Sequence, residues 1–572
     1  MSEINNKRVA EFLFEIADLL DLKGVQFKPR AYRRAAQNIS TLSKNIKLYH
    51  EEDKLEEIEG VGESIANKVK EIIETGDLEY LNELRNEFPE GLQELMNIQG
   101  LGPKTLMKLY KQLDVENIDD LEAAAKNHKI RDVEGFGKKS EQNILEGIEM
   151  YKKFQERFLL GYILPIANGI REKLENHDEV KRIKVAGSIR RKKETVGDVD
   201  ILIVSSNPEK VMDFFTQLSE VERIVSKGST KSTIITADNL QMDLRVVEEP
   251  SFGSALQYFT GSKEHNIKLR TIALEKNYKL SEYGLIEKDT NNSIAGENEK
   301  HIYDALGLEF IVPELREDRG EVKAAQKGNL PNLITVDDIK GDLHVHTTWS
   351  EGSHSIEEMA KTAEEMGYEY LGICDHAKTL QVAQGINDDE ILEQIEEIRD
   401  INKKLNNITI LSGIEANIDS DGHLDVSDDV LDQLDVVVAS VHSGFKSSEQ
   451  EMTDRILTAI HNEHVNILGH PTGRMLNKRE AYELNLTKLF ETASELDVFL
   501  EINSFPDRLD LSDINCFKAK DYDVKLAINT DSHSRDHLRY IKLGVFTARR
   551  GWIQSEEVVN TLNLTDLKGI LK

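Results

Sequence analysis

Three aspartates in the middle of the chain have the spacing of a two-metal site. The segment GDVDILIV predicts a strand that begins at Asp198 and Asp200, and their i, i+2 spacing places both carboxylates on one face. Asp243 lies in a second alternating segment, LQMDLRVV, from which it could face the pair. Three convergent carboxylates can hold two divalent cations, one activating a hydroxyl and one stabilising a triphosphate and its leaving group. Mg²⁺ suits such a site, because it binds a few carboxylates together with substrate phosphate oxygens.

A glycine turn before the aspartates could hold phosphate. Gly187 and Ser188 are followed by Arg190 and Arg191. Backbone amides, a hydroxyl and a guanidinium suit a β,γ-phosphate. Taken alone, the GDVD segment is better explained by a turn with solvated acids. The upstream Gly-Ser and the distant third aspartate favour a catalytic site.

A second set of possible metal ligands follows residue 340. His344 and His346 share a face of one predicted strand. Six further residues end later apolar segments: His376, Glu415, His442, His470, Asp531 and His533. A single histidine at a strand end is usually structural, but eight ligand-type residues on one rim are not explained that way. Mixed imidazole and carboxylate ligation suits Mn²⁺, Zn²⁺ or Fe, and two to three ions would use this many ligands.

The elements that carry this second set predict a barrel. Seven short apolar segments alternate with helical patterns such as IEEMAKTAEEMG at 356–367. This alternation indicates parallel βα units, and seven or eight of them favour a barrel with its active site at the carboxyl ends of the strands. Bound ions there would generate hydroxide and polarise a phosphoryl oxygen.

One glycine pattern occurs three times in the helical N-terminal region. It reads IEGVGESIANKV at 58–69, IQGLGPKTLMKL at 98–109 and VEGFGKKSEQNI at 133–144. The pattern resembles the helix-hairpin-helix module, in which amides at a helix N-terminus meet a DNA phosphate. A plain helical corner explains one copy equally well, whereas three copies favour backbone binding without base reading. The glycines are Gly60, Gly62, Gly100, Gly102, Gly135 and Gly137.

The order of motifs over residues 1–320 resembles that of the family X DNA polymerases. The series is Gly-Ser-x-Arg-Arg, Gly-Asp-x-Asp, Asp-x-Arg and YFTGSKEHNIKLR at 258–270, preceded by PRAYRRAA at 29–36. The resemblance implies a β-polymerase palm, gapped or primed double-stranded DNA and dNTPs as substrates, and attack of a primer 3′-OH on the α-phosphate.

The resemblance also implies roles for individual residues. The three aspartates would bind metal, and Asn266 and Arg270 would contact the incoming base and the template strand. Triphosphate contacts would come from Arg157, Gly187, Ser188, Arg191 and Gly197. The sugar of the nucleotide would be lined by Tyr258, Phe259 and Gly261.

Relatives can remove a 5′-deoxyribose phosphate through a lysine Schiff base. Lys68 matches that nucleophile, and Arg34 matches a nearby 5′-phosphate contact. Lys68 also suits a solvent-facing position on a helix. A nucleophilic lysine needs desolvation or cationic neighbours to lower its pKa, and the sequence shows neither.

The region from 340 onward resembles the polymerase-and-histidinol-phosphatase (PHP) domain, through HxH, DH, GxE, SVH, GHPxGR and DSH. The resemblance implies a ninth ligand at Glu351, with His354 as a local competitor, and a phosphate contact from Arg474. It also implies Mn²⁺-dependent 3′→5′ exonuclease activity and processing of 3′ ends or abasic sites. Because every ligand position is filled, we expect an active domain.

These patterns predict a multidomain chain with a helical N-terminal region, an α+β palm and a distorted (βα)7 barrel. The expected boundaries are 1–85 for the lyase-like domain, 86–160 for the thumb and fingers, 161–250 for the palm, 251–315 for the nascent-base-pair subdomain, 316–339 for a linker without a clear helix, and 340–572 for the PHP domain.

Composition is compatible with DNA binding despite a net charge of −32. Backbone binding needs only local positive potential, and clusters occur at residues 28–34 and 181–193. No run of eighteen apolar residues and no secretion signal is found, and two cysteines cannot form a disulfide framework. We expect a cytoplasmic monomer that associates with the nucleoid when bound to DNA.

Three functions remain open at this point. The first is a repair polymerase that fills short gaps and trims 3′ ends. The second is a nucleotidyltransferase fused to a small-molecule phosphomonoesterase. The third is a non-catalytic DNA scaffold, which would predict an incomplete carboxylate set, whereas all three aspartates are present.

Overall fold

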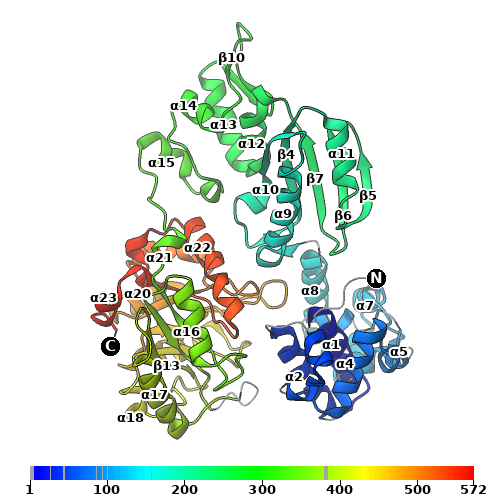
Figure 1. The fold of residues 1–572 in the computed structure, drawn as a ribbon, viewed down its shortest axis with the longest axis vertical. Helices are drawn as coiled ribbons and strands as arrows, with labels where there is room; N and C mark the ends of the chain where they lie inside the picture. The colour runs from blue at the N-terminus through cyan, green and yellow to red at the C-terminus, as the bar shows by residue number, and fades with distance from the viewer. Residues whose placement is uncertain are drawn as a thin grey trace. The chain divides into compact units, whose positions relative to one another are not determined.

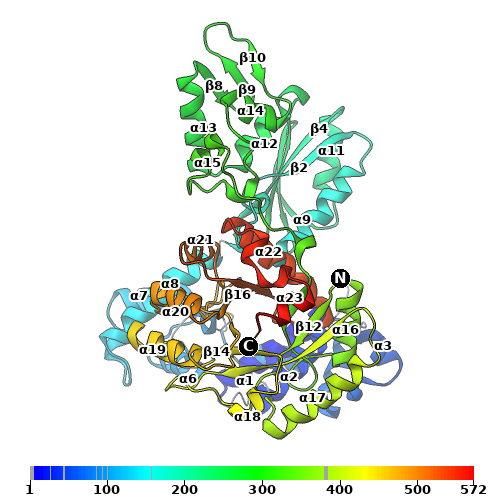
Figure 2. The same ribbon diagram turned by 90° about the vertical axis from the view of Figure 1, so that its left-hand side faces the viewer.

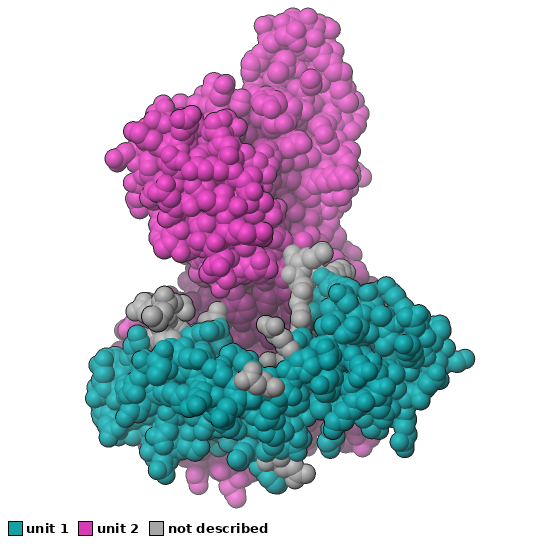
Figure 3. Space-filling model, turned by 90° about the vertical axis from the view of Figure 1, so that its right-hand side faces the viewer, with its two compact units in different colours: residues 1–155 teal, residues 156–572 magenta. Residues whose placement is uncertain are grey.

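The computed structural model divides into two compact units, residues 1–155 and residues 156–572, which Figure 3 colours separately. It describes residues 6–25, 27–42, 46–58, 60–85, 87–89, 91–92, 94–98, 101–155, 157–378 and 384–571. Within these ranges, no helix is both long and apolar enough to cross a membrane. Cys374 and Cys516 are buried free thiols.

The first unit is helical, as expected. Its helices are α1 (Asn6–Leu22), α2 (Lys28–Thr41), α3 (Ile46–Glu51), α4 (Glu63–Thr75), α5 (Glu79–Arg85), α6 (Pro103–Leu113), α7 (Ile118–Lys126) and α8 (Lys138–Gln155). In α1, Val9, Leu13 and Ile16 lie on one face and are fully buried. They belong to one apolar core that runs from Val9 to Ile148.

The helix-hairpin-helix turns share one backbone geometry where they are described. Gly60 and Gly135 have φ angles of 76° and 90°, which a side chain would strain. Gly62 and Gly102 are the N-cap residues of α4 and α6, and no atom would meet a Cβ added at either position. Each of these helices therefore begins with an open N-terminus. Gly100 lies outside the described residues.

The palm is a five-stranded sheet in the order β2-β4-β7-β6-β5 (Figure 1). Its strands are β2 (Val180–Val185), β4 (Asp198–Ser205), β5 (Val221–Lys227), β6 (Lys231–Thr236) and β7 (Gln241–Val246). Only the β4 and β7 pair runs parallel among the strand pairs described in this sheet. A short pair, β1 (Phe158–Leu159) and β3 (Thr195–Val196), precedes β4, and the helices are α9 (Leu160–Glu175), α10 (Gly187–Arg190) and α11 (Pro208–Thr216).

Residues 251–339 form a smaller α+β subdomain and its connection to the barrel. The subdomain holds α12 (Phe252–Thr260), α13 (Lys263–Glu275), β8 (Tyr278–Ser281), β9 (Gly284–Glu287), β10 (Ser293–Ala295) and α14 (Glu299–Leu306). The expectation that 316–339 contains no helix is wrong, because α15 (Glu321–Lys327) lies there. The segment 316–339 is polar in sequence, but two of its charged residues, Arg316 and Glu321, are fully buried. Arg316 pairs with Glu299, and Glu321 pairs with His265.

The C-terminal region is a nearly closed barrel of seven parallel strands in sequence order. The strands are β11 (Gly341–Val345), β12 (Tyr370–Ile373), β13 (Thr409–Asn417), β14 (Val436–Ser440), β15 (Ile467–Leu468), β16 (Phe499–Asn503) and β17 (Leu526–Asn529). A parallel bridge between Val345 and Ser532 connects the two edges. This confirms the predicted distorted (βα)7 barrel.

Helices surround the barrel strands (Figure 2). They are α16 (Ile356–Glu365), α17 (Asp388–Asn402), α18 (Asp428–Leu431), α19 (Glu449–Ile460), α20 (Leu486–Glu495), α21 (Asp513–Ala519), α22 (Ile541–Arg550) and α23 (Leu564–Lys568). Both faces of the strands are buried: along β14, Val436 and Val438 belong to one apolar cluster and Val437 and Ala439 to another. Parallel sheets covered on both faces require such continuous apolar strands.

The palm and the barrel share a packed contact within the second unit. Leu509 and Leu543 of the barrel join the apolar core of the palm. A Cβ added at Gly161 of α9 would lie 2.7 Å from Pro506, so the glycine permits this close approach. Tyr162 donates a hydrogen bond to Asp507 at 2.6 Å. These contacts fix the palm against the barrel.

Candidate active sites

Strands β4 and β7 of the palm bring the three aspartates to one face of the sheet. In the parallel pairing of β4 and β7, Asp200 lies directly opposite Asp243, and Asp198 lies opposite Gln241. Paired residues on neighbouring strands project to the same face. Asp198, two residues before Asp200, shares that face. The arrangement gathers three carboxylates from two adjacent strands.

The electrostatics around the three aspartates favour cation binding. Burial, together with Asp198 and Asp243, raises the pKa of Asp200 to about 6. The Lys231 ammonium lies 2.7 Å from Asp243 Oδ2, and the Thr233 hydroxyl donates to Asp243 Oδ1 at 2.6 Å. A positive group therefore already contacts the carboxylates. Clustered carboxylates that repel one another are stabilised by bound cations.

The predicted phosphate turn lies against the carboxylates. Gly187 has a φ angle of 67°, and a Cβ there would lie 3.3 Å from Asp200 Oδ2. A side chain would be strained at this φ angle and tight against Asp200, so glycine suits the turn. Ser188 follows it in α10, and Gly197 separates β3 from β4. Arg157 lies beside the same strands, where its guanidinium donates to the Thr195 hydroxyl at 2.8 Å and to the Thr195 carbonyl at 2.6 Å.

The two arginines after this turn connect the palm to the 251–339 subdomain. Arg190 forms a two-point ion pair with Glu299, at 3.0 and 2.7 Å. Arg191 donates through Nε to Glu317 at 2.8 Å and through Nη1 to the Thr260 carbonyl. Both guanidiniums are thereby held in one orientation.

The segment expected to meet the nucleotide sugar and base forms the end of α12 and the start of α13. Tyr258 and Phe259 pack edge to face, and the Arg245 guanidinium lies 4.5 Å from the Phe259 ring centre. Gly261 follows with a φ angle of 64°. Asn266 donates to the Tyr258 carbonyl at 2.8 Å.

Two further bonds hold the polar residues of α13. The Asn266 carboxamide oxygen accepts from Gln257 at 2.6 Å. Arg270 donates through Nε to the Asn266 carbonyl at 3.3 Å. These bonds orient both side chains expected to meet the base pair.

Lys68 of the first unit is partly desolvated and has a cationic neighbour, two features that the sequence could not show. Partial burial and the neighbouring Lys28 lower the pKa of Lys68. Its ammonium lies 4.7 Å from the Tyr80 ring centre. A Cβ added at Gly60 of the first hairpin would lie 3.0 Å from Arg34 Cγ, so Arg34 borders this hairpin. Desolvation and a cationic neighbour favour the neutral amine that a Schiff base requires.

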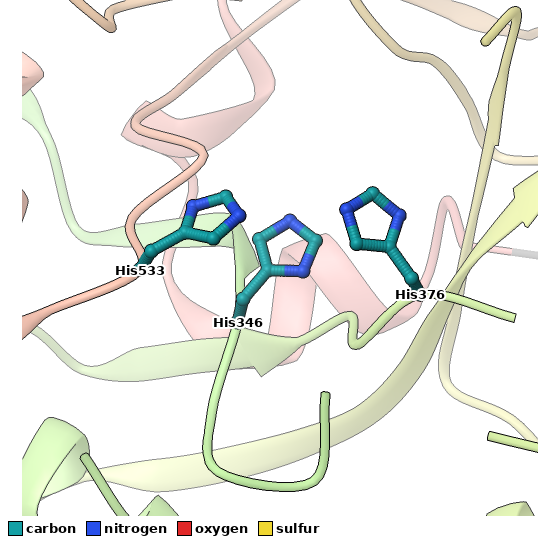
Figure 4. Close-up of side chains that lie close together, drawn as sticks. All are labelled: His346, His376 and His533. Carbon is teal, nitrogen blue, oxygen red and sulfur yellow. The ribbon is translucent and has the colours of Figure 1, made fainter. Parts of the chain in front are cut away.

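The barrel gathers its ligand-type residues at the carboxyl ends of its strands. Figure 4 shows the rings of His533, His346 and His376 side by side, from three separate segments. The His346 ring centre lies 4.3 Å from that of His533 and 4.5 Å from that of His376. Among the described residues, three groups have ligand atoms within 4.8 Å of one another: His346, His376 and His533; His344, His346 and Asp531; His376, Glu415 and His442.

Glu415 lies at the centre of these groups. Its Oε1 lies 3.1 Å from His470 Nε2 and 3.2 Å from His442 Nε2, and its Oε2 lies 3.5 Å from His344 Nε2. Burial opposes ionisation, yet the surrounding histidines hold the pKa of Glu415 well below its usual value. A buried anion among imidazoles is a strong cation site.

Glu351, rather than His354, joins the cluster. Its Oε1 lies 2.9 Å from His376 Nε2 and 3.1 Å from His533 Nε2. Among the described residues, the His354 side chain makes no ion pair or ring contact with the histidines of the cluster, whereas Glu351 contacts two of them. The geometry therefore favours Glu351 as the ninth ligand.

The donor atoms of the cluster fit metal ions. Five buried atoms make no hydrogen bond to any described residue: His346 Nδ1, Glu351 Oε2, His376 Nδ1, Glu415 Oε2 and His470 Nδ1. His376 Nδ1 lies 2.7 Å from Glu415 Oε2 without hydrogen-bonding geometry. Buried polar atoms almost always have a partner, and cations bound between these atoms would supply one. The residues present fit a multinuclear centre.

Comparison with known proteins identifies the family. The DNA polymerase/3'-5' exonuclease PolX of Bacillus subtilis (strain 168) is 38% identical over 572 residues, which is 100% of both chains. The chain belongs to the family X DNA polymerases with a PHP domain. Family models match along the chain as follows: a helix-hairpin-helix domain at 4–78, a SAM-like helix-hairpin-helix tandem at 92–150, a DNA polymerase beta palm at 163–257, a DNA polymerase beta thumb at 255–317 and a PHP domain at 342–505. The thumb model thus follows the palm, where the sequence predicted the nascent-base-pair subdomain.

Two other relatives each resemble part of this family X chain. A "probable phosphatase" of Thermoanaerobacter sp. (strain X514) is 31% identical over 231 residues, which is 38% of this chain and 89% of the relative. DNA polymerase lambda of Rattus norvegicus is 25% identical over 342 residues, which is 54% of this chain and 56% of the relative.

Sequence reasoning missed Glu501, the residue of β16 that supports the family X barrel site. Its Oε1 accepts from His344 Nδ1 at 2.8 Å, and its Oε2 accepts from the His470 backbone at 2.7 Å. The first bond leaves His344 Nε2 facing Glu415. Carboxylates behind metal-binding histidines fix the ring and its tautomer in this way. The signal was present in the segment VFLEINS, where a single glutamate stands inside a mostly apolar strand.

Arg474, expected at a substrate phosphate, pairs with the palm in this structure. Its guanidinium donates to Glu194 at 2.7 Å and to the Leu509 carbonyl. Arg508 contacts the cluster, with Nε 3.6 Å from Asp531 Oδ2. The phosphate role of Arg474 stays a prediction.

Proposed function

We propose that this chain is a repair DNA polymerase of family X, which fills short gaps in its palm and removes nucleotides from 3′ ends in its barrel. The observation that carries the polymerase assignment is the register of β4 and β7, which sets Asp200 beside Asp243 with Asp198 on the same face. Asp200 also lies against the Gly187 turn. Three carboxylates beside a turn that can bind phosphate suit transfer of a nucleotide to a 3′-hydroxyl.

The palm residues position the reacting groups. Asp198, Asp200 and Asp243 would hold two Mg²⁺ or Mn²⁺ ions, which supply charge stabilisation to the triphosphate when bound. Ser188 and the backbone amides of its turn would receive the β,γ-phosphates, together with Gly197, Arg157 and Arg191. The sugar and base would lie against the end of α12, at Tyr258, Phe259 and Gly261, with Asn266 and Arg270 beyond. Catalysis of this kind is mostly positioning and electrostatics.

The barrel would hold two to three ions of Mn²⁺, Zn²⁺ or Fe on its histidine and carboxylate ligands. Such ions generate a hydroxide nucleophile and polarise a phosphoryl oxygen. A 3′-terminal phosphodiester is the substrate that suits a polymerase partner, because its hydrolysis exposes a new primer end. Removal of blocked 3′ ends or abasic sites would use the same hydrolysis of a phosphodiester.

The first unit would bind the DNA backbone. The open N-termini of α4 and α6 offer unpaired amides to phosphate, as does the hairpin at Gly135 and Gly137. Gapped or primed duplex is the proposed partner. The monomeric state, the cytoplasmic location and the six domain boundaries stay predictions.

Product analysis tests this function directly. A 5′-labelled primer on a one-nucleotide gap is incubated with the pure protein, with dNTPs in one arm and without them in the other. We expect extension by one nucleotide in the first arm and a ladder of single-nucleotide shortening in the second. Absence of extension under both Mg²⁺ and Mn²⁺ contradicts the polymerase assignment.

A small-molecule phosphatase is the second candidate for the barrel, because a protein named a probable phosphatase matches 38% of the chain. Hydrolysis of p-nitrophenyl phosphate is measured beside release of nucleotides from the labelled primer. This alternative predicts rapid turnover of the small ester and an intact primer. The exonuclease assignment predicts the opposite preference.

A further inference from the structure

The C-terminal end of α22 connects the barrel to the segment 313–321, which follows the smaller α+β subdomain. Arg549 donates through Nε to Glu314 at 2.8 Å. Its neighbour Arg550 donates through Nη1 to Glu317 at 3.0 Å and through Nη2 to Asp513 at 2.7 Å. The Arg550 side chain is 4% exposed, so these bonds are made away from solvent.

Glu317 is shared between the barrel and the palm. Its Oε1 accepts from Arg550 and also from Arg191 Nε, at 2.8 Å. Arg550 Nη1 donates to the backbone carbonyl of Arg191 at 2.8 Å as well. One barrel arginine therefore holds both the main chain and, through Glu317, the side chain of Arg191.

The ion-pair network around Glu317 and Asp513 contains more positive than negative groups. Asp513 also accepts from Arg319 at 2.9 Å. Three guanidiniums, those of Arg191, Arg319 and Arg550, thus face two carboxylates. Without Arg550, the network would be neutral, and Glu317 would pair with Arg191 alone. A buried carboxylate interacts more strongly with one guanidinium when it is not shared with a second.

The orientation of Arg191 follows from the same contacts. Its Nε donates to Glu317 and its Nη1 to the Thr260 carbonyl. These two acceptors fix the guanidinium. Its Nη2 makes no hydrogen bond to any described residue and remains able to donate to a phosphate. A guanidinium held in this way binds phosphate with little loss of side-chain entropy.

We propose that Arg550 is a positioning residue for nucleotidyl transfer: the barrel helix α22 orients Arg191 through Glu317 and keeps its charge available to the triphosphate of the incoming nucleotide. The barrel is then a structural part of the polymerase nucleotide site as well as a nuclease. This inference rests on the proposed polymerase function.

Gap-filling kinetics test the inference with the full-length protein. For Arg550→Gln we expect KM for the dNTP to rise roughly tenfold, with kcat changed less than about threefold, because ground-state phosphate binding is weakened. The exonuclease rate, measured on the same preparation, is expected to stay within about twofold and shows that the barrel is folded. Arg549→Gln is the matched control, since it removes the adjacent ion pair without touching Glu317 or Arg191.

A conservative variant covers the case in which Arg550→Gln does not fold. Arg550→Lys keeps the charge but cannot reach Glu317, Asp513 and the Arg191 carbonyl together, and its KM is expected to lie between those of the wild type and Arg550→Gln. An unchanged KM in the folded Arg550 variants, or an equal rise in Arg549→Gln, overturns the inference. Wild-type protein that extends no primer would instead overturn the polymerase function itself.

Discussion

At the scale of single residues, protonation of the barrel histidines determines how metal binds. Burial opposes the charge on His376, but Glu415 and Glu351 raise its pKa to about 10. Burial with His533 and His376 lowers the pKa of His346 to about 4. In the metal-free protein, His376 is therefore protonated and His346 neutral at pH 8. Metal must displace the His376 proton, since imidazole binds metal in its neutral form.

Metal affinity of the barrel should consequently increase with pH. Between pH 7 and pH 9, a rise in pH reduces the cost of removing the His376 proton, so Mn²⁺ binds more tightly. Calorimetry in two buffers of different ionisation enthalpy measures the protons released. Affinity that is independent of pH, together with no proton release, contradicts the assigned protonation.

Lys68 should form a Schiff base with a 5′-deoxyribose phosphate, because burial and Lys28 lower its pKa. Lys68→Arg is expected to reduce borohydride trapping on incised abasic DNA by about a hundredfold, as a guanidinium is not a nucleophile. Lys28→Gln raises the pKa of Lys68 and should shift the pH profile of trapping upward. Lys70→Arg, on the same helix, is the matched control; equal trapping by wild type and Lys68→Arg removes the lyase proposal.

Residues were predictable where their chemistry follows from type and spacing. Asp198 and Asp200 share a face in any strand, so their placement follows from the i, i+2 pattern. The choice between Glu351 and His354 needed the fold, because both lie in one loop and only the distances to His376 and His533 separate them. The partner of Arg474 was unpredictable, since Glu194 is 280 residues away.

At the scale of elements, β16 supports the metal site without supplying one of the predicted ligands. Glu501→Gln should weaken metal binding about 10–100-fold, because His344 and the His470 backbone lose a charged acceptor. Competition with a chelator measures this loss, and gap filling should be unaffected. Glu491→Gln, at an exposed position of α20, is the control. Metal affinity within twofold of wild type would show that Glu501 has no such role.

Elements were predicted best where one hydrophobic period runs unbroken. The seven apolar segments became seven barrel strands, since continuous apolar runs need cover on both faces. Helix α15 was missed because its residues, EVKAAQK, are mostly polar and bury little apolar surface. At its start, Glu321 lies 2.7 Å from His265, a pairing across 56 residues that local patterns do not contain.

At the scale of the whole molecule, two candidate metal sites lie in separate folds of one compact unit. The palm carboxylates come from β4 and β7, whereas all three described ligand groups come from the barrel. The contacts between palm and barrel include Tyr162 with Asp507, Arg191 with Arg550, and Glu194 with Arg474. None of these residues belongs to the three ligand groups found in the described part of the chain. Each chemistry should therefore survive loss of the other.

Two single substitutions on one gapped substrate measure that independence. Asp198→Ala is expected to abolish primer extension while leaving 3′→5′ degradation unchanged, and His344→Ala is expected to do the reverse. Both variants are first shown to be folded by circular dichroism, and each provides the control for the other. Loss of both activities in either folded variant would contradict the account of two separate active sites.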